Sequence, residues 1–286
     1  MVQCSKFKPE VFGCLMISIL CLALFMTSVI TNEWVKGNAS NAEDSADYIT
    51  VNFGLFSGHK EKNRGTKINT DLSVVCYEGV CMYSCGGIED IKDILKGKNS
   101  SEDTSSGDNI CKEKGWENEA NSAGIDTNGP IAENMIKFGL WLSTIIFFFI
   151  GLTFSLINIV LVILNTAHNP VSSILGIDGL VIWNIGSSVS YLLVLILWGA
   201  LFSSRISENL CISETLRVNG LQWSSAGQSS LGYSYWLVFP TMILHMVNAG
   251  ILGYRQYAMY YAPKSRNAKN LQMRVQESAD GKDMLY

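Results

Sequence analysis

The chain has 286 residues, of which 48% are hydrophobic and 16% are charged, and its formal net charge is −4. An average soluble protein carries about 25% charged residues, so the charge content is low, and the acidic balance gives no basis for nucleic-acid binding. The charge is also uneven, because residues 33–137 contain 18 acidic and 11 basic residues whereas residues 255–286 contain 3 acidic and 6 basic ones.

Four segments contain no Asp, Glu, Lys or Arg: residues 11–30, 138–164, 180–204 and 235–254. A bilayer core of about 30 Å is crossed by roughly 20 apolar helical residues, so each segment is long enough to span a membrane. The sequence therefore predicts an all-α membrane four-helix bundle with spans at 11–31, 138–164, 179–204 and 235–254. A cleaved signal peptide is the alternative for the first segment, but its apolar run is longer than the roughly 7–15 residues of such peptides.

The positions of Lys and Arg predict the orientation of the spans. Lys6 and Lys8 precede the first span and four basic residues follow the last one within residues 255–269. Basic residues beside spans tend to stay in the cytosol, whereas a loop of about 100 residues crosses largely regardless of its charge. We therefore expect a plasma-membrane protein with both termini in the cytosol. Its cytosolic segments would be 1–10, 165–178 and 255–286, and its extracellular loops 32–137 and 205–234.

Two N-glycosylation sequons lie in the large predicted extracellular loop. They begin at Asn38 and Asn99, and no other sequon occurs in the chain. Because glycosylation requires an asparagine outside the cytosol, the two sites agree with the predicted orientation.

Five of the eight cysteines lie in predicted extracellular loops, where disulfides are expected. Residues 74–83 read as a hairpin with a Glu-Gly turn, which places Cys76 opposite Cys81 at a non-hydrogen-bonded position suited to a bridge. A slipped register, with Cys81 paired elsewhere, remains the alternative. Of the other extracellular cysteines, Cys85 and Cys111 are the nearest in sequence and are the expected second pair. Cys211 then has no partner within the chain. A structural zinc site would need four Cys or His ligands, so no metal and no cofactor are expected.

Two further elements are predicted around this hairpin. Residues 48–55 alternate between apolar and polar side chains, as in a half-buried strand, so a small extracellular antiparallel sheet is expected. Apolar residues at helical spacing in 88–95 predict a short amphipathic helix. Residues 96–130 are too polar to bury much surface, and we expect a mobile segment there.

The spans carry no formal charge, which argues against a proton pump, a voltage sensor or an ion-coupled transporter. Asn158, Asn184 and Asn248 are predicted at nearly the same depth, about 6–9 Å from the cytosolic helix ends at 1.5 Å per residue. We expect them to form one hydrogen-bonded layer joining the second, third and fourth spans, with His245 one turn away. The alternative is that a backbone carbonyl satisfies each polar group separately.

The predicted cytosolic tail is basic and rich in tyrosine, which suits an anionic membrane surface, although it also fits ordinary topology-setting charge. The chain ends in Met284, Leu285 and Tyr286. PDZ domains bind the terminal carboxylate of such hydrophobic-x-hydrophobic ends, so a PDZ scaffold is an expected partner.

Several segments resemble those of one known family. Residues 234–239, followed by His245 and Asn248, are similar to the fourth span of the clarins, and residues 53–58 resemble a Tyr-Gly-Leu-Phe-x-Gly segment of the same family. The residues that carry the likeness are Trp34, Gly54, Leu55, Phe56, Trp236 and Phe239. The resemblance implies a four-pass, claudin-like fold and a plasma-membrane role in sensory cells, linked to hair-bundle, photoreceptor and synapse organisation, to actin and to hearing.

Three classes of function follow from these observations. The first is a non-enzymatic organiser or adaptor that contacts membrane lipids, PDZ scaffolds and the actin-linked cortex, and that can form homo-oligomers. The second is a channel or an auxiliary subunit of a channel or mechanotransduction complex, and the third is a claudin-like adhesion protein. An enzyme is not expected, because the three histidines are predicted outside, inside and within the membrane and no nucleophile motif is present.

Overall fold

The computed structural model describes residues 9–41, 48–64, 66–85, 87–95, 135–167, 176–207, 210, 223–224 and 227–283. They belong to two compact units, each described by itself. We name them the helical unit (Met1–Cys21, Thr153–Ser188 and Ile243–Tyr286) and the sheet unit (Leu22–Leu152 and Val189–Met242). The predictions for the mobile segment 96–130, for Asn99 and Cys111, and for Met284, Leu285 and Tyr286 fall outside the described residues.

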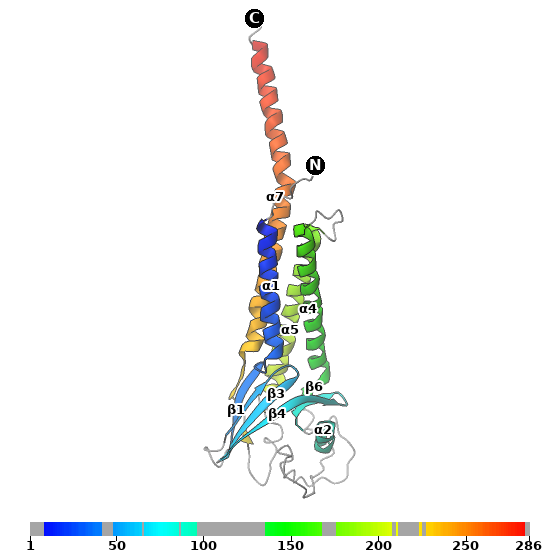
Figure 1. The fold of residues 1–286 in the computed structure, drawn as a ribbon, viewed down its shortest axis with the longest axis vertical. Helices are drawn as coiled ribbons and strands as arrows, with labels where there is room; N and C mark the ends of the chain where they lie inside the picture. The colour runs from blue at the N-terminus through cyan, green and yellow to red at the C-terminus, as the bar shows by residue number, and fades with distance from the viewer. Residues whose placement is uncertain are drawn as a thin grey trace. The chain divides into compact units, whose positions relative to one another are not determined.

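Four long helices are present: α1 (Pro9–Ile30), α4 (Phe138–Ala167), α5 (Ile177–Leu201) and α7 (Tyr233–Asp283) (Figure 1). Each contains a segment that is long and apolar enough to cross a membrane: Phe12–Ile30, Phe138–Thr166, Ile177–Ile206 and Tyr233–Ala258. The four-span prediction is therefore confirmed, and the chain is a four-pass membrane protein.

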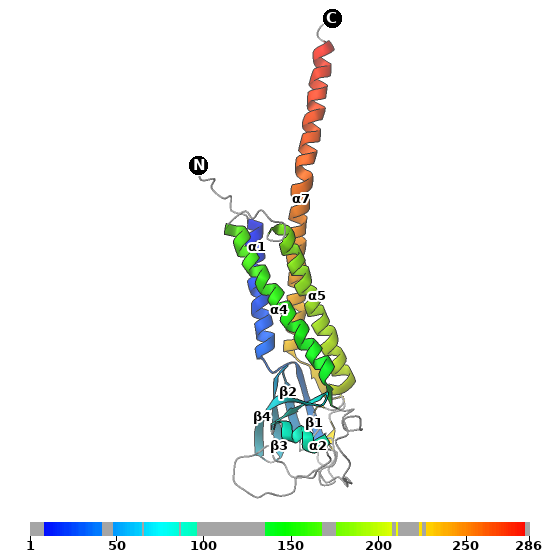
Figure 2. The same cartoon turned by 90° about the vertical axis from the view of Figure 1, so that its right-hand side faces the viewer.

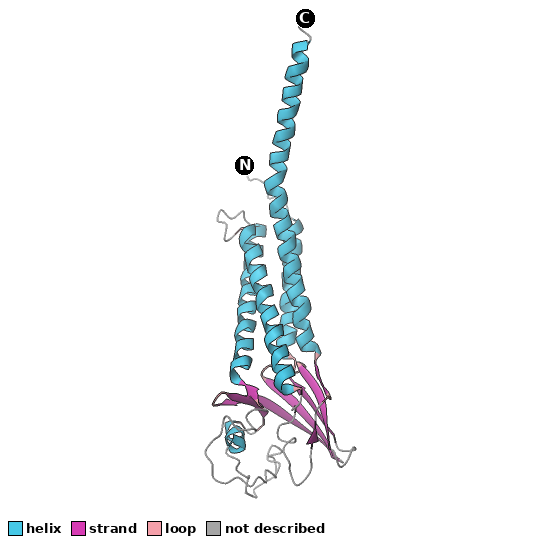
Figure 3. Ribbon diagram, turned by 180° about the vertical axis from the view of Figure 1, so that it is seen from behind, coloured by secondary structure: helices cyan, strands magenta, loops and turns pink. Residues whose placement is uncertain are grey.

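Two of these helices continue beyond their predicted spans. A π-helical turn, η1 (Phe202–Ile206), follows α5 directly. Helix α7 has 51 residues and runs without a break well past the predicted end of the last span at residue 254 (Figure 3). The part of the tail from Arg255 to Asp283 is therefore a continuation of the last helix rather than a separate element.

An antiparallel sheet of eight strands forms in the sheet unit. Its strands are β1 (Val35–Asn41), β2 (Tyr48–Phe53), β3 (Ser57–Arg64), β4 (Thr66–Tyr77), β5 (Val80–Ser84), β6 (Ile136–Lys137), β7 (Trp223–Ser224) and β8 (Ser229–Leu231). The order is β6-β5-β4-β3-β2-β1-β7, and β8 also pairs with β1. The sheet is confirmed, but it is larger than the small sheet predicted, because strands β1, β3, β7 and β8 have weak sequence patterns.

The face of the sheet that packs against helices is built from alternate residues of its strands. Val35 and Ala39 on β1, and Ile49, Val51 and Phe53 on β2, are all buried. The residues between them, such as Asn38 and Thr50, lie opposite one another on the other face. This alternation follows from the two-residue repeat of a strand and explains why β2 was predictable.

The hairpin between β4 and β5 has the predicted register. Glu78 and Gly79 occupy the turn with φ angles of 44° and 89°, as a two-residue type I′ turn requires. Tyr77 pairs with Val80, and the next pair is Cys76 with Cys81. The structure joins these two cysteines in a disulfide with a Cα–Cα distance of 4.0 Å.

Helix α2 (Ile88–Leu95) covers part of the opposite face of the sheet (Figure 2). Ile91 and Leu95 are buried in a second small core, whose other members are Val75, Val80, Met82 and Met135. Ile88 is 51% exposed, so this position of the predicted apolar face is not buried. A helix of eight residues has room for about two turns, which limits how many apolar residues can face one surface.

An aromatic core connects the sheet with the adjoining parts of the helices inside the sheet unit. Trp34, which follows α1, is fully buried, and its ring meets Trp198 at 5.2 Å and Tyr235 at 6.1 Å between centroids. Its indole Nε1 donates to the carbonyl of Ser28 at 2.7 Å. Because an aromatic ring buries a large area and its N–H is satisfied, Trp34 stabilises the junction of α1 and β1.

Candidate functional site: a buried polar cluster between the spans

Seven polar side chains meet inside the helical unit, and we name them the polar cluster. All seven are buried, and they come from α1, α4, α5 and α7: Ser18, Ser155, Asn158, Asn184, Ser187, His245 and Asn248. Polar groups in a membrane interior are expensive unless they are hydrogen-bonded, so the partners of each group decide what the cluster can do.

Asn158 and Asn184 form a reciprocal amide pair between α4 and α5. The Nδ2 of Asn184 donates to the Oδ1 of Asn158 at 2.8 Å, and the Nδ2 of Asn158 lies 3.3 Å from the Oδ1 of Asn184. Asn184 also donates to the carbonyl of Leu180, one turn earlier on its own helix, at 2.8 Å. Since a carbonyl can only accept, this contact fixes which end of the Asn184 amide is nitrogen.

Helices α1 and α7 join this pair through Ser18 and Asn248. The hydroxyl of Ser18 accepts from Asn158 Nδ2 at 2.9 Å and from Asn248 Nδ2 at 3.0 Å, and it donates to the carbonyl of Cys14 at 2.8 Å. Asn248 Nδ2 lies 3.3 Å from Asn184 Oδ1 and 3.4 Å from the carbonyl oxygen of Cys14. One serine therefore contacts two asparagines from different helices.

His245 connects the amides to two further serines. Its Nδ1 is 3.0 Å from Asn184 Oδ1, and its Nε2 is 3.1 Å from Ser155 Oγ. An amide oxygen can only accept, so Nδ1 carries the proton and the neutral ring accepts at Nε2. Ser155 is also 3.4 Å from Ser187 Oγ, and Ser187 donates to the carbonyl of Trp183.

The structure brings together all four residues of the predicted intramembrane layer, Asn158, Asn184, Asn248 and His245. The prediction was incomplete, because it linked three spans and omitted α1. Ser18 could have been found from the pattern of α1, where Cys14, Ser18, Cys21, Phe25 and Ser28 are buried at helical spacing. The alternative was that a backbone carbonyl satisfies each polar group separately. That arrangement is found elsewhere in the spans, for example at Thr241, which donates to the carbonyl of Leu237 on its own helix.

The hydrogen bonds run from Ser155 to His245 and from His245 to Asn184. Hydrolases with a catalytic triad arrange a nucleophile, a base and an orienting group in this way. However, Ser155 is 1% exposed and His245 is fully buried, so the hydroxyl is closed to a substrate. An acyl-transfer site also needs backbone N–H donors for an oxyanion, and these are occupied inside a continuous helix. These hydrogen bonds therefore hold α4, α5 and α7 together.

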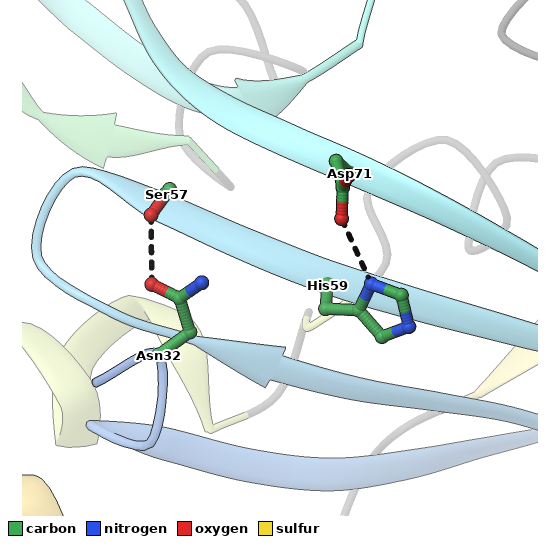
Figure 4. Close-up of polar contacts among 4 residues, drawn as sticks. All are labelled: Asn32, Ser57, His59 and Asp71. Carbon is green, nitrogen blue, oxygen red and sulfur yellow. Dashed lines mark hydrogen bonds and ion pairs between the residues drawn. The ribbon is translucent and has the colours of Figure 1, made fainter. Parts of the chain in front are cut away.

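Polar contacts lie on the sheet near the β2–β3 turn, and Figure 4 shows two of them. Ser57 donates to Asn32 Oδ1 at 2.7 Å. Nearby, Asn52 donates to Glu33 at 2.9 Å. His59 Nδ1 lies 3.0 Å from Asp71, but this carboxylate side chain is 96% exposed, so the pair adds little stability. Among the described residues there is no group of three His, Cys, Asp or Glu side chains that could hold a metal.

The remaining predicted modification sites that the structure describes lie in the sheet unit. Asn38 is exposed on β1, where its Oδ1 accepts from Thr50 Oγ1 at 3.0 Å. Cys85 is disulfide-bonded. Because Cys76 and Cys81 pair with each other and Cys14 and Cys21 are not in disulfides, the partner of Cys85 lies outside the described residues.

With this geometry in view, the chain can be compared with known proteins. No protein-family model matches it. It is 30% identical to human Clarin-3 over 118 residues, which is 41% of this chain and 50% of the relative. It is 28% identical to mouse Clarin-3 over 131 residues, or 46% of this chain and 56% of the relative. The chain is therefore similar to clarins over part of its length. It spans about half the length of the curated clarins that it matches.

The segments that resemble clarins have identifiable structural roles. A Cβ at Gly54 would lie 2.7 Å from Asn32 Oδ1, so glycine is required by this close approach. Leu55 is buried and its carbonyl accepts from Trp141 Nε1 at 3.0 Å, while Phe56 is exposed and meets the Trp141 ring edge-on. The clarin-like Gly-Leu-Phe segment therefore fixes the β2–β3 turn against the start of α4.

Tyr83 on β5 contacts the clarin-like turn segment, and a second clarin-like segment lies on α7. Tyr83 donates its hydroxyl to the carbonyl of Gly54, and burial raises the pKa of this phenol well above its usual range. Trp236 and Phe239 are 56% and 48% exposed on α7, whereas Tyr235, directly before Trp236, is buried and donates to the carbonyl of Leu195. The clarin-like segment in the fourth span thus mixes outward aromatic residues with inward polar contacts.

Proposed function

We propose that this chain is a clarin-like, non-enzymatic four-pass organiser or adaptor of the plasma membrane. In this role it supports membrane and actin organisation at the hair bundles, photoreceptors or synapses of sensory cells. The observation that carries the proposal is the similarity to Clarin-3 in the human and the mouse. The proposal assigns the sheet to the cell exterior and both chain ends to the cytosol.

The contacts between the helices support a structural rather than a catalytic role. The polar cluster is neutral, and its donors are used within the bundle. Outside the cluster, the described spans present large apolar side chains outward, including Met16, Phe149, Val160 and Ile182, each at least 50% exposed. Such residues suit contact with lipid acyl chains, so membrane lipids are the first partners in this proposal.

The two surfaces available for other partners lie at the sheet and at the tail. The outward sheet face carries Lys36, Asn52, His59 and Asp71 in directly opposed pairs on four strands. Polar faces of this kind suit extracellular contacts, whereas the basic tail and its hydrophobic end suit a PDZ scaffold linked to the actin cortex. Homo-oligomers formed through the apolar outer surfaces of the helices are part of the same proposal.

The orientation is tested with epitope tags at each terminus and with sequon variants. Tags at both ends should stain only after permeabilisation, while a tag within residues 96–130 should stain intact cells. Glycosidase treatment should increase gel mobility, and Asn38→Gln and Asn99→Gln should each remove one glycan step. Staining of a terminal tag on intact cells would overturn the orientation.

The organiser role is tested by proximity labelling from the tail in a ciliated or microvillar sensory cell. PDZ and actin-linked proteins should be labelled by the natural chain and lost from a variant with one glycine added after Tyr286, which blocks recognition of the free carboxylate. A variant with the same glycine added at the N-terminus is the matched control. Equal labelling by all three would contradict the PDZ partner, and conductance of the purified protein in planar bilayers would contradict the organiser role.

A further inference from the structure

The orientation of the Asn248 amide is fixed by its neighbours in the polar cluster. One end of this side chain faces the carbonyl oxygen of Cys14 and the Oδ1 of Asn184, at 3.4 and 3.3 Å. Both atoms can only accept hydrogen bonds, because the Asn184 amide is itself oriented by the carbonyl of Leu180. The end of Asn248 that faces them is therefore Nδ2, and the opposite end is the oxygen.

The oxygen of Asn248 is an acceptor to which no described residue donates. The residue is fully buried, and Oδ1 has no hydrogen-bond partner among the described residues. The donors around it are already committed: Ser18 donates to Cys14, and Asn184 donates to Asn158 and Leu180. Asn248 Oδ1 is therefore an acceptor in the cluster that the described donors leave unsatisfied.

We propose that the polar cluster binds a water molecule at Asn248 Oδ1 and is a hydrated site between the spans. Water supplies the donor that this oxygen requires, and buried waters in proteins bind where several polar groups converge. An amide oxygen left without a donor in a membrane interior would be strongly unfavourable.

The charge distribution favours water over an alkali cation, the other species that an acceptor-rich site attracts. Residues 12–21, 153–167, 179–188 and 243–254, which surround the cluster, contain no Asp, Glu, Lys or Arg. A cation there would have no counter-charge, and burial of an unpaired charge costs far more than burial of a water molecule.

X-ray radiolysis of the full chain in lipid nanodiscs tests the proposal. Radiolysis converts bound water to hydroxyl radicals, which oxidise the nearest side chains even where bulk solvent has no access. His245, one turn from Asn248 and fully buried, should be oxidised. Phe148, which is buried among aromatic rings, is the internal control and should stay unmodified.

The variant Asn248→Leu, which has no acceptor, should lose the oxidation at His245 while its thermal unfolding remains cooperative. Unmodified His245 in the natural chain, or equal oxidation of His245 and Phe148, would overturn the proposal without any use of the variant. Unchanged oxidation in a folded Asn248→Leu protein would also overturn it. A melting temperature that rises with sodium chloride but not with choline chloride would assign the site to a cation instead.

Discussion

Replacement of Asn184 by leucine tests whether the polar cluster stabilises the bundle. Asn184 makes four hydrogen bonds to other helices: two with Asn158, one with His245 and one with Asn248. Contacts of this kind in membrane proteins are worth about 0.6 kcal/mol each, so Asn184→Leu should lower the free energy of unfolding by about 2 kcal/mol. Leucine is close to asparagine in size, so the loss is expected to come from the hydrogen bonds.

The assay is unfolding of the purified protein in mixed micelles with increasing SDS. Thr144→Val is the matched control, because Thr144 is buried in the same kind of environment but donates only to the carbonyl of Leu140 on its own helix. The double variant Asn158→Leu with Asn184→Leu should cost less than the sum of the single variants, since the two amides share partners. If Asn184→Leu unfolded at the same SDS fraction as the control, the reasoning would be refuted.

Four further predictions concern other parts of the chain. Gly151→Ala should destabilise the protein by about 1–3 kcal/mol, because the added Cβ would lie 2.6 Å from the Tyr191 ring. Gly139→Ala is the control, since its Cβ would meet no atom within 4 Å, and the thermal unfolding midpoints of the two variants are compared. Replacement of Cys76 and Cys81 by serine should cost about 2 kcal/mol in denaturant unfolding, the low end for disulfides, because the enclosed loop is short. An unchanged midpoint would show that the bridge is dispensable. A fluorophosphonate probe should leave Ser155 unmodified, and covalent labelling detected by mass spectrometry would reopen the enzymatic interpretation. Glu61→Gln should lower the pKa of Lys67 in an NMR titration, since the hydrogen bond that Lys67 donates to Glu61 and the charge of Glu61 raise that pKa in the natural chain. No change would mean that the 2.8 Å contact is not formed in solution.

The parts of the fold that were predictable have a strong local signal. The spans follow from long uncharged segments, and the β4–β5 hairpin follows from the Glu-Gly turn between β-forming residues. Strand β3 was missed because it reads Ser-Gly-His-Lys-Glu-Lys-Asn-Arg, with no apolar alternation. Its backbone pairs on both sides with β2 and β4, so neighbouring strands rather than its own side chains determine its structure.

The polar cluster was partly predictable for a related reason. Asparagine is rare in spans, so Asn158, Asn184 and Asn248 stand out and their depths can be counted along the helices. Serine is common and can donate to its own helix, so the sequence does not reveal that Ser18 accepts from two asparagines while it donates to Cys14. That contact depends on the rotation of α1, which only the packed bundle defines.

The pairing of β1 with β8 also constrains when the protein can finish folding. Val35, Lys36 and Gly37 pair with Leu231, Ser230 and Ser229, nearly two hundred residues later in the chain. During translation, β1 emerges long before β8. This edge of β1 therefore lacks its β8 partner until α1, α4 and α5 have been synthesised. A ribosome stalled before residue 229 would therefore leave the N–H and C=O groups of this edge unpaired by β8.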